Sequence, residues 1–337
     1  MGRLAMSDAK ASNHWTGRSA LVTGAGGFVG SWLAKALVDR GADVTVILRD
    51  QPHNSNFDNL GLGSTVNVVP GSITDLPIVE RAMNEYTVDA VFHLAAQAMV
   101  GVANRAPLST FESNIRGTWN VLEAARTTSS VTAVVVASSD KAYGSQAQLP
   151  YVESAPLLAR SPYDVSKACT DLLAATYHHT YGLPATTARC ANVYGGGDLN
   201  FSRLVPGTIR SALEGTQPLI RSNGTPVRDY LYIDDAVDAY LTLGQSAGTD
   251  GVAGSAFNFG MNAPVSVMDL VAQILSACER TDLEPIVQDA VQPGAEIDRQ
   301  YLDSSRAQQV LGWRPATSLG DGLSAAAAWY REYLEAA

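Results

Sequence analysis

A glycine-rich turn between a short apolar run and an amphipathic segment is the feature that most constrains how this chain can fold. Ser19–Thr23 is apolar and β-rich, and the turn after it reads Gly24-Ala-Gly-Gly27-Phe-Val-Gly30. Apolar residues then recur at helical spacing over Phe28–Arg40, and Gly41 ends that pattern. Strand, turn and helix in this register predict a βαβ unit in which a pyrophosphate approaches the backbone at the helix N-terminus. A tight structural turn is the alternative.

The same alternation of strand and helix patterns continues along the chain. Short apolar runs are separated by helical patterns, at Val44–Leu48, Val66–Val69, Ala90–Leu94, Val131–Ala137 and Ala185–Cys190. Strands that alternate with helices pair in parallel, and right-handed crossovers place helices on both faces of the sheet. The sequence therefore predicts an α/β fold with a doubly wound parallel sheet of the Rossmann type. Its ligands are expected at the carboxyl ends of the strands.

After Asn192 the alternation weakens, which predicts a smaller C-terminal substrate lobe. Helical patterns remain at Leu204–Leu213 and Val267–Cys278, while Tyr230–Leu243 and Ala256–Gly260 are expected to return to the main domain as a helix and a strand. The expected division is a mobile leader over 1–15, a cofactor-binding domain over 16–191 plus 229–260, and a substrate-binding lobe over 192–228 plus 261–337.

Composition narrows the classes of function. The 337 residues carry a formal net charge of −10, which disfavours binding to nucleic acids or to anionic membranes. The three cysteines show no metal-ligand spacing, and His178-His179 has no carboxylate partners at ligand spacing, so no metal site is expected. The chain has no signal-peptide pattern and no apolar run of membrane-spanning length, so a cytoplasmic location is expected.

A tyrosine and a lysine supply a candidate acid–base pair. Tyr163-Asp-Val-Ser-Lys167 follows Pro162 at an expected helix start, so the two side chains share one helical face. A neighbouring ammonium is expected to lower the pKa of the tyrosine so that the phenol can act as a base. On its own this spacing also fits a surface pair.

These segments together resemble the extended short-chain dehydrogenase/reductase superfamily from about Gly17 to Trp313. The markers occur in order as Thr23-Gly-Ala-Gly-Gly-Phe-Val-Gly30, His93-Leu-Ala-Ala-Gln97, Asn114-Ile-Arg-Gly-Thr118, Ser138-Ser139, Tyr163-x-x-x-Lys167, Asn192-Val-Tyr-Gly195 and Arg228-Asp-Tyr230. The resemblance implies a Rossmann domain, a tightly bound and recycled NAD or NADP, and a nucleotide-diphosphate sugar as substrate. It also implies a homodimer formed by the helices that carry Asn114 and Tyr163.

The resemblance assigns catalytic roles to individual residues. Ser139 holds the sugar O4, Tyr163 takes its proton, Lys167 binds the nicotinamide ribose, and Asn114 supports the active-site water or helix. The cofactor-binding positions are Gly24, Gly27, Phe28, Val29, Gly30, Arg49, Asp50, Ser72, Ile73, Ala95, Ala96, Tyr163 and Lys167. The substrate-binding positions are Asn192, Arg228 and Arg299, with Arg203 added by its place in the chain.

Three of the cofactor positions leave questions open. Arg49 favours NADP, because a guanidinium accommodates a 2′-phosphate, whereas Asp50 favours NAD, because a carboxylate binds the ribose diol. Both can also be solvated surface charges. Ser72 stands where the superfamily usually has an aspartate at the adenine, and it is expected to weaken that contact.

The segment Ser138-Ser-Asp-Lys-Ala-Tyr-Gly144 distinguishes between reactions. CDP-glucose 4,6-dehydratases carry Asp-Lys after the serines, dTDP-glucose 4,6-dehydratases carry Asp-Glu, and epimerases carry small or apolar residues. Oxidation at C4 makes the C5 proton acidic, and loss of water then needs a base at C5 and an acid at O6. Lys141 and Asp140 are the expected base and acid. The predicted product is a 4-keto-6-deoxy hexose, formed after hydride return to C6.

Two alternatives stay open. Asp140 and Lys141 can be a plain ion pair in a nucleotide-sugar 4-epimerase, and Val29 and the Arg228–Asp235 segment depart from the CDP-glucose pattern. An alternative of another class is a non-catalytic NAD(P)-binding sensor, which would not need Ser139, Tyr163 and Lys167 together.

Overall fold

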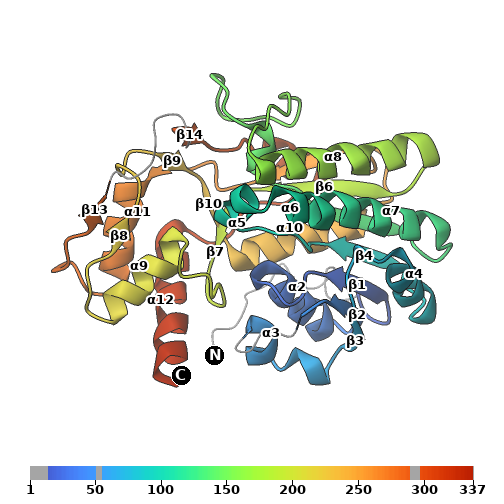
Figure 1. The fold of residues 1–337 in the computed structure, drawn as a ribbon, viewed down its shortest axis with the longest axis horizontal. Helices are drawn as coiled ribbons and strands as arrows, with labels where there is room; N and C mark the ends of the chain where they lie inside the picture. The colour runs from blue at the N-terminus through green and yellow to red at the C-terminus, as the bar shows by residue number, and fades with distance from the viewer. Residues whose placement is uncertain (1–13, 51–54, 289–296, 337) are drawn as a thin grey trace. The chain divides into compact units, whose positions relative to one another are not determined.

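The computed structural model describes residues 14–50, 55–288 and 297–336, and its backbone contacts divide the chain into two compact units (Figure 1). The first unit comprises Met1–Ala137, Cys169–Thr187 and Tyr240–Ala256, and the second comprises Ser138–Ala168, Ala188–Ala239 and Phe257–Ala337. The division into a cofactor domain and a substrate lobe stays a prediction, because it concerns what each part binds.

A seven-stranded sheet has the order β11-β6-β5-β4-β1-β2-β3. Its strands are β1 (Ser19–Thr23), β2 (Asp43–Leu48), β3 (Asn67–Pro70), β4 (Ala90–His93), β5 (Ala133–Ala137), β6 (Ala185–Cys190) and β11 (Ala256–Phe259). The neighbouring pairs from β3 to β5 are parallel. Parallel neighbours require crossover connections, and helices supply them here. This confirms the predicted α/β fold with a parallel sheet, and the strands lie within two residues of their predicted bounds.

Helices cover both faces of this sheet, as two consecutive residues of β4 show. Val91 packs in one core with Met83 of α4 (Leu76–Glu85) and Val121 of α7 (Gly117–Thr127). Phe92 points to the opposite face, where its ring lies against Gly244 of α10 (Ile233–Ser246). The other helices that contribute to this unit are α2 (Phe28–Asp39), α3 (Asn56–Asn59), α5 (Val100–Arg105), α6 (Pro107–Phe111), the π-helix η2 (Glu112–Arg116), the 3-10 helix η1 (Leu62–Ser64) and part of α8 (Pro162–Tyr181).

The second unit has a separate hydrophobic core. Ile209 of α9 (Leu204–Leu213), Ile274 of α11 (Val267–Ala277) and Tyr330 of α12 (Leu319–Ala336) are fully buried there. Three small sheets accompany these helices. They pair β7 (Asn192–Tyr194) with β10 (Tyr230–Tyr232), β9 (Val227–Arg228) with β12 (Val265–Ser266) and β14 (Arg299–Gln300), and β8 (Leu219–Ile220) with β13 (Ile286–Val287). Two short helices complete it, the 3-10 helix η3 (Asp140–Tyr143) and the π-helix η4 (Ala307–Leu311).

Two predicted boundaries are corrected. The helix expected from Tyr230 begins at Ile233, because Tyr230–Tyr232 pairs with β7 as a parallel strand and this aromatic run fits a pleated surface. Residues 1–13 of the predicted leader lie outside the described residues. Trp15, at the end of that leader, is fully buried and its ring lies 5.5 Å from that of Phe92, so it belongs to the core.

The structure also bears on membrane insertion. Among the helices of the described residues, none combines the length and the apolar character needed to cross a bilayer.

Candidate active site

The turn between β1 and α2 has the close backbone packing of a phosphate-binding loop. Gly24 has a φ of +81°, and a Cβ there would lie 2.6 Å from the backbone nitrogen of Ala95. A Cβ on Gly30 would lie 2.2 Å from the carbonyl oxygen of Gly24, so the helix can approach the strand only without a side chain. Gly27 precedes the first turn of α2 and has no side chain to cap it, which leaves the first amides for an external acceptor. The residues present therefore fit a pyrophosphate.

Other predicted cofactor positions lie at the same edge of the first unit. Arg49 and Asp50 form an exposed ion pair with 2.7 Å between Nε and Oδ2, so each charge partly neutralises the other. The Ser72 hydroxyl hydrogen bonds Thr74 at 2.8 Å. Ile73 is buried, and its carbonyl accepts a hydrogen bond from Asn120. Phe28, Val29, Ala95 and Ala96 are half-buried.

Asn114 lies in the π-helix η2 and holds the loop that follows β4. Its Oδ1 accepts the Gln97 amide at 2.6 Å, and its Nδ2 donates to the Gln97 carbonyl at 3.2 Å. Nearby, the buried ring of His93 hydrogen bonds Thr23 through Nδ1 and Thr118 through Nε2. Both ring nitrogens are thus engaged in the framework, which fits a structural role for His93.

The segment Ser139–Lys141 forms the start of η3 in the second unit. The Ser139 hydroxyl caps this turn by accepting the Lys141 amide at 3.2 Å, and it donates to Oδ1 of Asp140 at 2.9 Å. Asp140 is buried, and its Oδ2 has no hydrogen-bond partner among the described residues. An unpartnered buried carboxyl oxygen is costly unless a ligand or a proton engages it.

Gln300 is a residue that the sequence analysis missed. It is fully buried on β14, and its Nε2 donates to the backbone carbonyl of Asp140 at 2.9 Å. Its Oε1 accepts a hydrogen bond from Nζ of Lys141. The contact joins residues about 160 positions apart, so the local sequence pattern around Gln300 carries no signal for it.

Tyr163 and Lys167 lie one turn apart at the start of α8, as their spacing predicts. Lys167 is buried, and its backbone carbonyl accepts the Ser138 hydroxyl at 3.2 Å. Burial raises the pKa of Tyr163 to about 12, the charge of Asp140 adds to that effect, and Arg203 and a hydrogen bond with Ser139 oppose it. The expected lowering of this pKa by Lys167 is therefore wrong for the protein alone, because desolvation of the phenolate dominates.

Asp164 is a second residue that the sequence analysis did not single out. Burial raises the pKa of its carboxyl, and the charges of Lys141 and Asp140 act on it in opposite directions. The chain therefore gathers two carboxyls, an amine and a phenol within one part of the second unit.

The predicted substrate-binding side chains all lie in the second unit. Nδ2 of Asn192 donates to the Asp229 carbonyl at 3.3 Å, and Arg203 pairs with the buried Asp198 at 2.9 Å. Arg228 is buried on β9 and donates to the carbonyl of Val227 at 2.9 Å. Arg299 is exposed on β14, which pairs in parallel with β9. The three-stranded sheet thus carries two of the predicted arginines on adjacent strands, with Arg228 on the face of its register partner Gln300 and Arg299 on the opposite face.

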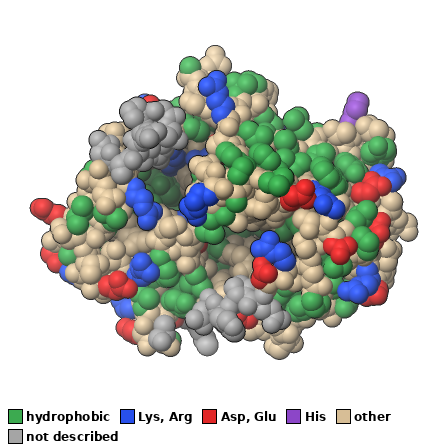
Figure 2. All heavy atoms as spheres, viewed as in Figure 1, with side chains coloured by type: hydrophobic (Ala, Val, Ile, Leu, Met, Phe, Trp, Pro, Cys, Tyr) green, Lys and Arg blue, Asp and Glu red, His purple; other side chains and the backbone are tan. Residues whose placement is uncertain are grey.

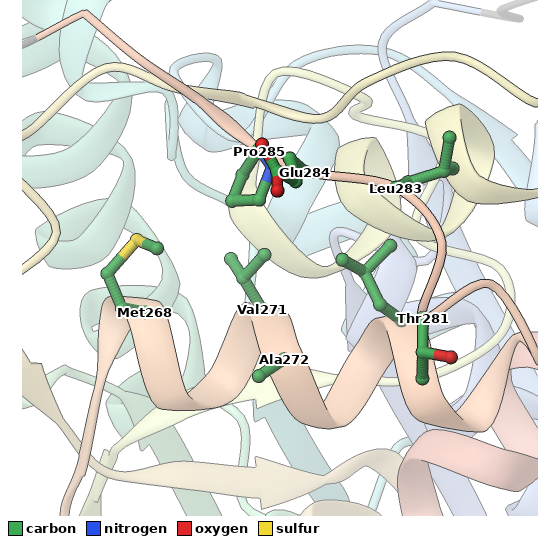
Figure 3. A pocket seen from close by; sticks show the side chains of 8 residues that line it. Met268, Val271, Ala272, Thr281, Leu283, Glu284 and Pro285 are labelled. Carbon is green, nitrogen blue, oxygen red and sulfur yellow. The ribbon is translucent and has the colours of Figure 1, made fainter.

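A pocket of about 220 Å³ in the second unit lies apart from these residues (Figure 3). Met268, Val271 and Ala272 of α11 line it, together with Leu283 and Pro285 of the segment that follows this helix. No predicted site residue lines it, so it carries no part of the expected chemistry. In the part of the chain that the structure describes, no His, Cys, Asp and Glu side chains cluster in a way that would hold a metal ion.

Comparison with known proteins gives the family. A model of the family described as GDP-mannose 4,6 dehydratase matches residues 21–326. This chain belongs to that family. It therefore falls in the nucleotide-sugar 4,6-dehydratase branch of the extended short-chain dehydrogenase/reductases, as the sequence resemblance predicted.

Three similar proteins include two dehydratases and one epimerase. CDP-glucose 4,6-dehydratase of Salmonella typhimurium is 29% identical over 335 residues, which cover 96% of this chain and 93% of the relative. The structure of dTDP-glucose 4,6-dehydratase from Streptomyces venezuelae, solved with NAD bound, has a TM-score of 0.82 and 29% identity over 93% of this chain and 97% of its own. UDP-glucose 4-epimerase of Thermotoga maritima, solved with UDP-glucose, has a TM-score of 0.85 and 30% identity over 94% and 99%.

Proposed function

We propose that this protein is a nucleotide-sugar 4,6-dehydratase, a lyase that converts a nucleotide-linked hexose into its 4-keto-6-deoxy derivative. The observation that carries the proposal is that Asp140 and Lys141 are consecutive residues of η3. Asp140 is buried with one carboxyl oxygen lacking a hydrogen-bond partner among the described residues, and Lys141 follows it directly. An epimerase needs no acid–base pair at C5 and C6, whereas a dehydratase does.

We infer that NAD or NADP is held by the glycine turn of the first unit, with Gly24, Gly27 and Gly30 shaping the pyrophosphate site. The family relationship and the NAD bound to the Streptomyces venezuelae relative support this. When bound, the nicotinamide would supply the redox chemistry, taking up a hydride from C4 of the sugar and giving it back at C6. Arg49 and Asp50 are paired with each other, so neither charge is presented to the cofactor unopposed.

In the first step Tyr163 takes the proton from the O4 hydroxyl while the C4–H bond breaks. Ser139 orients O4, and Lys167 holds the ribose of the cofactor. Burial and Asp140 keep the pKa of Tyr163 near 12 in the protein alone. Arg203 acts against that effect within the chain, and a bound oxidised nicotinamide would add a further positive charge that favours the phenolate.

In the second step water leaves from C5 and C6. Lys141 takes the proton from C5, the C5=C6 double bond forms, the C6–O bond breaks, and Asp140 gives a proton to the departing oxygen. A hydride at C6 and a proton at C5 then complete the methyl group and the saturated ring. The sugar loses one water and undergoes no net redox change.

The nucleotide diphosphate is proposed to bind at Asn192, Arg203, Arg228 and Arg299. Guanidinium groups suit paired phosphate oxygens, and they can bind such an anion despite the net negative charge of the chain. Arg228 and Arg299 come from adjacent strands of one small sheet, where Arg228 is buried and Arg299 is exposed on the opposite face. The same unit carries Tyr163 and Lys141, so the unit is proposed to bind the substrate.

Product analysis tests the proposal. The protein is incubated separately with CDP-, dTDP-, UDP- and GDP-hexoses in deuterated water, and the products are examined by NMR. We expect a 4-keto-6-deoxy sugar with deuterium at C5. Lys141→Met should abolish this product while C4 oxidation continues. The half-buried Lys35→Met serves as the matched control, because Lys35 forms its ion pair with Asp39 one turn away on α2. A C4 epimer without any keto sugar would contradict the dehydratase assignment.

The second candidate function is a 4-epimerase. The structural similarity to the Thermotoga maritima epimerase favours it, because that similarity is as high as the similarity to the dehydratase. In that case hydride returns to the other face of C4, and Lys141→Met leaves the rate of epimer formation near that of the wild type.

We further propose that the protein is a homodimer in the cytoplasm. Large apolar side chains are exposed on α6, α7 and α8 of the first unit, with exposed fractions of 73% for Leu108, 43% for Trp119 and 60% for Leu172. Figure 2 shows hydrophobic side chains gathered over these helices. Leu172→Glu is expected to give a monomer in analytical ultracentrifugation, while Leu219→Glu in the second unit should not change the sedimentation. The three free cysteines support a reducing compartment.

A further inference from the structure

We propose that Gln300 is a positioning residue for the elimination step, which holds Lys141 at C5 without taking over its proton. The proposal rests on the proposed dehydratase function and adds to it a residue outside the predicted site. Gln300 touches neither the sugar nor the cofactor in this assignment. It acts through Asp140 and Lys141.

The geometry of Gln300 links both members of the acid–base pair. Its side chain is fully buried, its Nε2 donates to the Asp140 carbonyl at 2.9 Å, and its Oε1 accepts from Nζ of Lys141. One amide thus spans two consecutive residues of η3. A half-buried lysine has four rotatable side-chain bonds, and a fixed acceptor at its tip removes much of that freedom.

Strand β14 also connects this contact to the proposed diphosphate site. Alternate residues of a strand point to opposite faces, so exposed Arg299 and buried Gln300 face opposite ways. Gln300 is the register partner of Arg228 on β9. Strand β14 therefore carries both Arg299, which is proposed to bind the diphosphate, and Gln300, which holds the proposed base Lys141. Substrate binding and placement of the base thus depend on the same strand.

The choice of an amide at this position has a chemical reason. An amide oxygen accepts a hydrogen bond from an ammonium or from a neutral amine, and it carries no net charge. A carboxylate of the same size would favour the ammonium and raise the pKa of Lys141. The carboxyl of Asp164 on α8 already lies close enough to this amine for the two charges to act on each other. A further carboxylate would leave the lysine protonated.

Three substitutions test the proposal, two at Gln300 and one at its neighbour Arg299. Gln300→Met removes the acceptor, Gln300→Glu adds charge at nearly constant size, and Arg299→Met changes the adjacent residue of β14. The nucleotide-hexose that the wild type converts is used for all three. C4 oxidation is followed by the absorbance of reduced nicotinamide in a single turnover, and elimination is followed by the keto product and by deuterium at C5.

For Gln300→Met we expect elimination to slow about 10²-fold, because a misplaced catalytic group costs about that much. Reduced nicotinamide should accumulate, because elimination slows while the rate of C4 oxidation and the KM stay within about twofold of the wild-type values. For Gln300→Glu we expect the rising limb of the pH–rate profile to move up by about one pH unit or more. For Arg299→Met we expect a higher KM with an unchanged ratio of elimination to oxidation.

The outcomes separate the two claims. If the wild type gives no keto product with any nucleotide-hexose, the proposed function fails and this assignment fails with it. If the wild type gives the product and Gln300→Met eliminates at the wild-type rate, only the role of Gln300 is overturned. Thermal unfolding reports whether each variant folds. If Gln300→Met does not fold, Gln300→Glu decides, and a pH profile equal to that of the wild type would overturn the proposal.

Discussion

The Ser139 hydroxyl donates a 2.9 Å hydrogen bond to Oδ1 of Asp140, while Oδ2 of the same buried carboxyl has no partner among the described residues. The carboxyl is therefore held in place by one oxygen and can present the other to a ligand. A purely structural aspartate would be expected to use both oxygens, because an unsatisfied buried acceptor costs about 1–3 kcal/mol.

Asp140→Asn should separate the two halves of the reaction. The amide cannot give a proton to O6, so elimination is expected to fall about 10²- to 10⁴-fold while C4 oxidation continues. Burial is the larger cause of the raised pKa of Tyr163, and the Asp140 charge is the next. Removing that charge lowers this pKa, so the rising limb of the pH profile for single-turnover C4 oxidation should move to lower pH. Asp282→Asn on an exposed turn is the control, and an equal shift in both variants would refute the assignment.

Tyr163→Phe should stop the reaction one step earlier. Without the phenol, no group takes the O4 proton, and we expect the rate of C4 oxidation to fall about 10²- to 10⁴-fold. Neither reduced nicotinamide nor keto product should appear, in contrast to Lys141→Met, which should accumulate the reduced form. Tyr333→Phe on α12 is the matched control. Substantial nicotinamide reduction by Tyr163→Phe would exclude the tyrosine as the base.

The parts of the fold that were predictable are those set by local pattern. Residues 19–23 and the glycines after them predict β1, the turn and α2. These elements are predictable because an apolar run and the conformational freedom of glycine determine structure over only a few residues. The i, i+4 placement of Tyr163 and Lys167 follows in the same way from helix geometry.

The parts that were not predictable depend on tertiary context. The contact of Gln300 with Lys141 joins segments far apart in the chain, and the π-helix around Asn114 inserts one residue into a helical pattern without a sequence mark. The pKa of Tyr163 was predicted in the wrong direction, because the spacing to Lys167 indicates a nearby charge but not the burial that outweighs it. Strand β10 replaces the start of a predicted helix because its pairing with β7 cannot be inferred locally.

Asp229→Asn should flatten the pH dependence of stability. Burial raises the pKa of Asp229 to about 6 from its usual 3.8. Its Oδ1 accepts the Met261 amide at 3.1 Å, while Oδ2 has no hydrogen-bond partner among the described residues. Through this carboxyl, the folded state thus binds more protons than the unfolded state between these pH values. The contribution of Asp229 to the free energy of unfolding is therefore most favourable below about pH 4 and falls as the pH rises through about 6. The ionised carboxylate costs on the order of 3 kcal/mol at neutral pH.

Urea unfolding of the wild type and of Asp229→Asn at several pH values measures this effect. The difference in unfolding free energy between the two proteins should change by a few kcal/mol between pH 4 and pH 7 in favour of the variant. A difference that does not depend on pH would show that Asp229 keeps an ordinary pKa in the folded protein.

Two glycines of the turn, four residues apart, give a prediction and its control. A Cβ on Gly30 would lie 2.2 Å from the Gly24 carbonyl oxygen, which belongs to rigid backbone, whereas a Cβ on Gly26 would meet only a Leu48 methyl at 3.5 Å. Gly30→Ala must therefore push α2 away from β1, and overpacking of this kind costs about 1–3 kcal/mol or more. Gly26→Ala makes an ordinary contact and should unfold within about 0.5 kcal/mol of the wild type. Urea denaturation of the two variants without cofactor measures the difference, and equal stability would show that the close approach of helix and strand is not required by the fold.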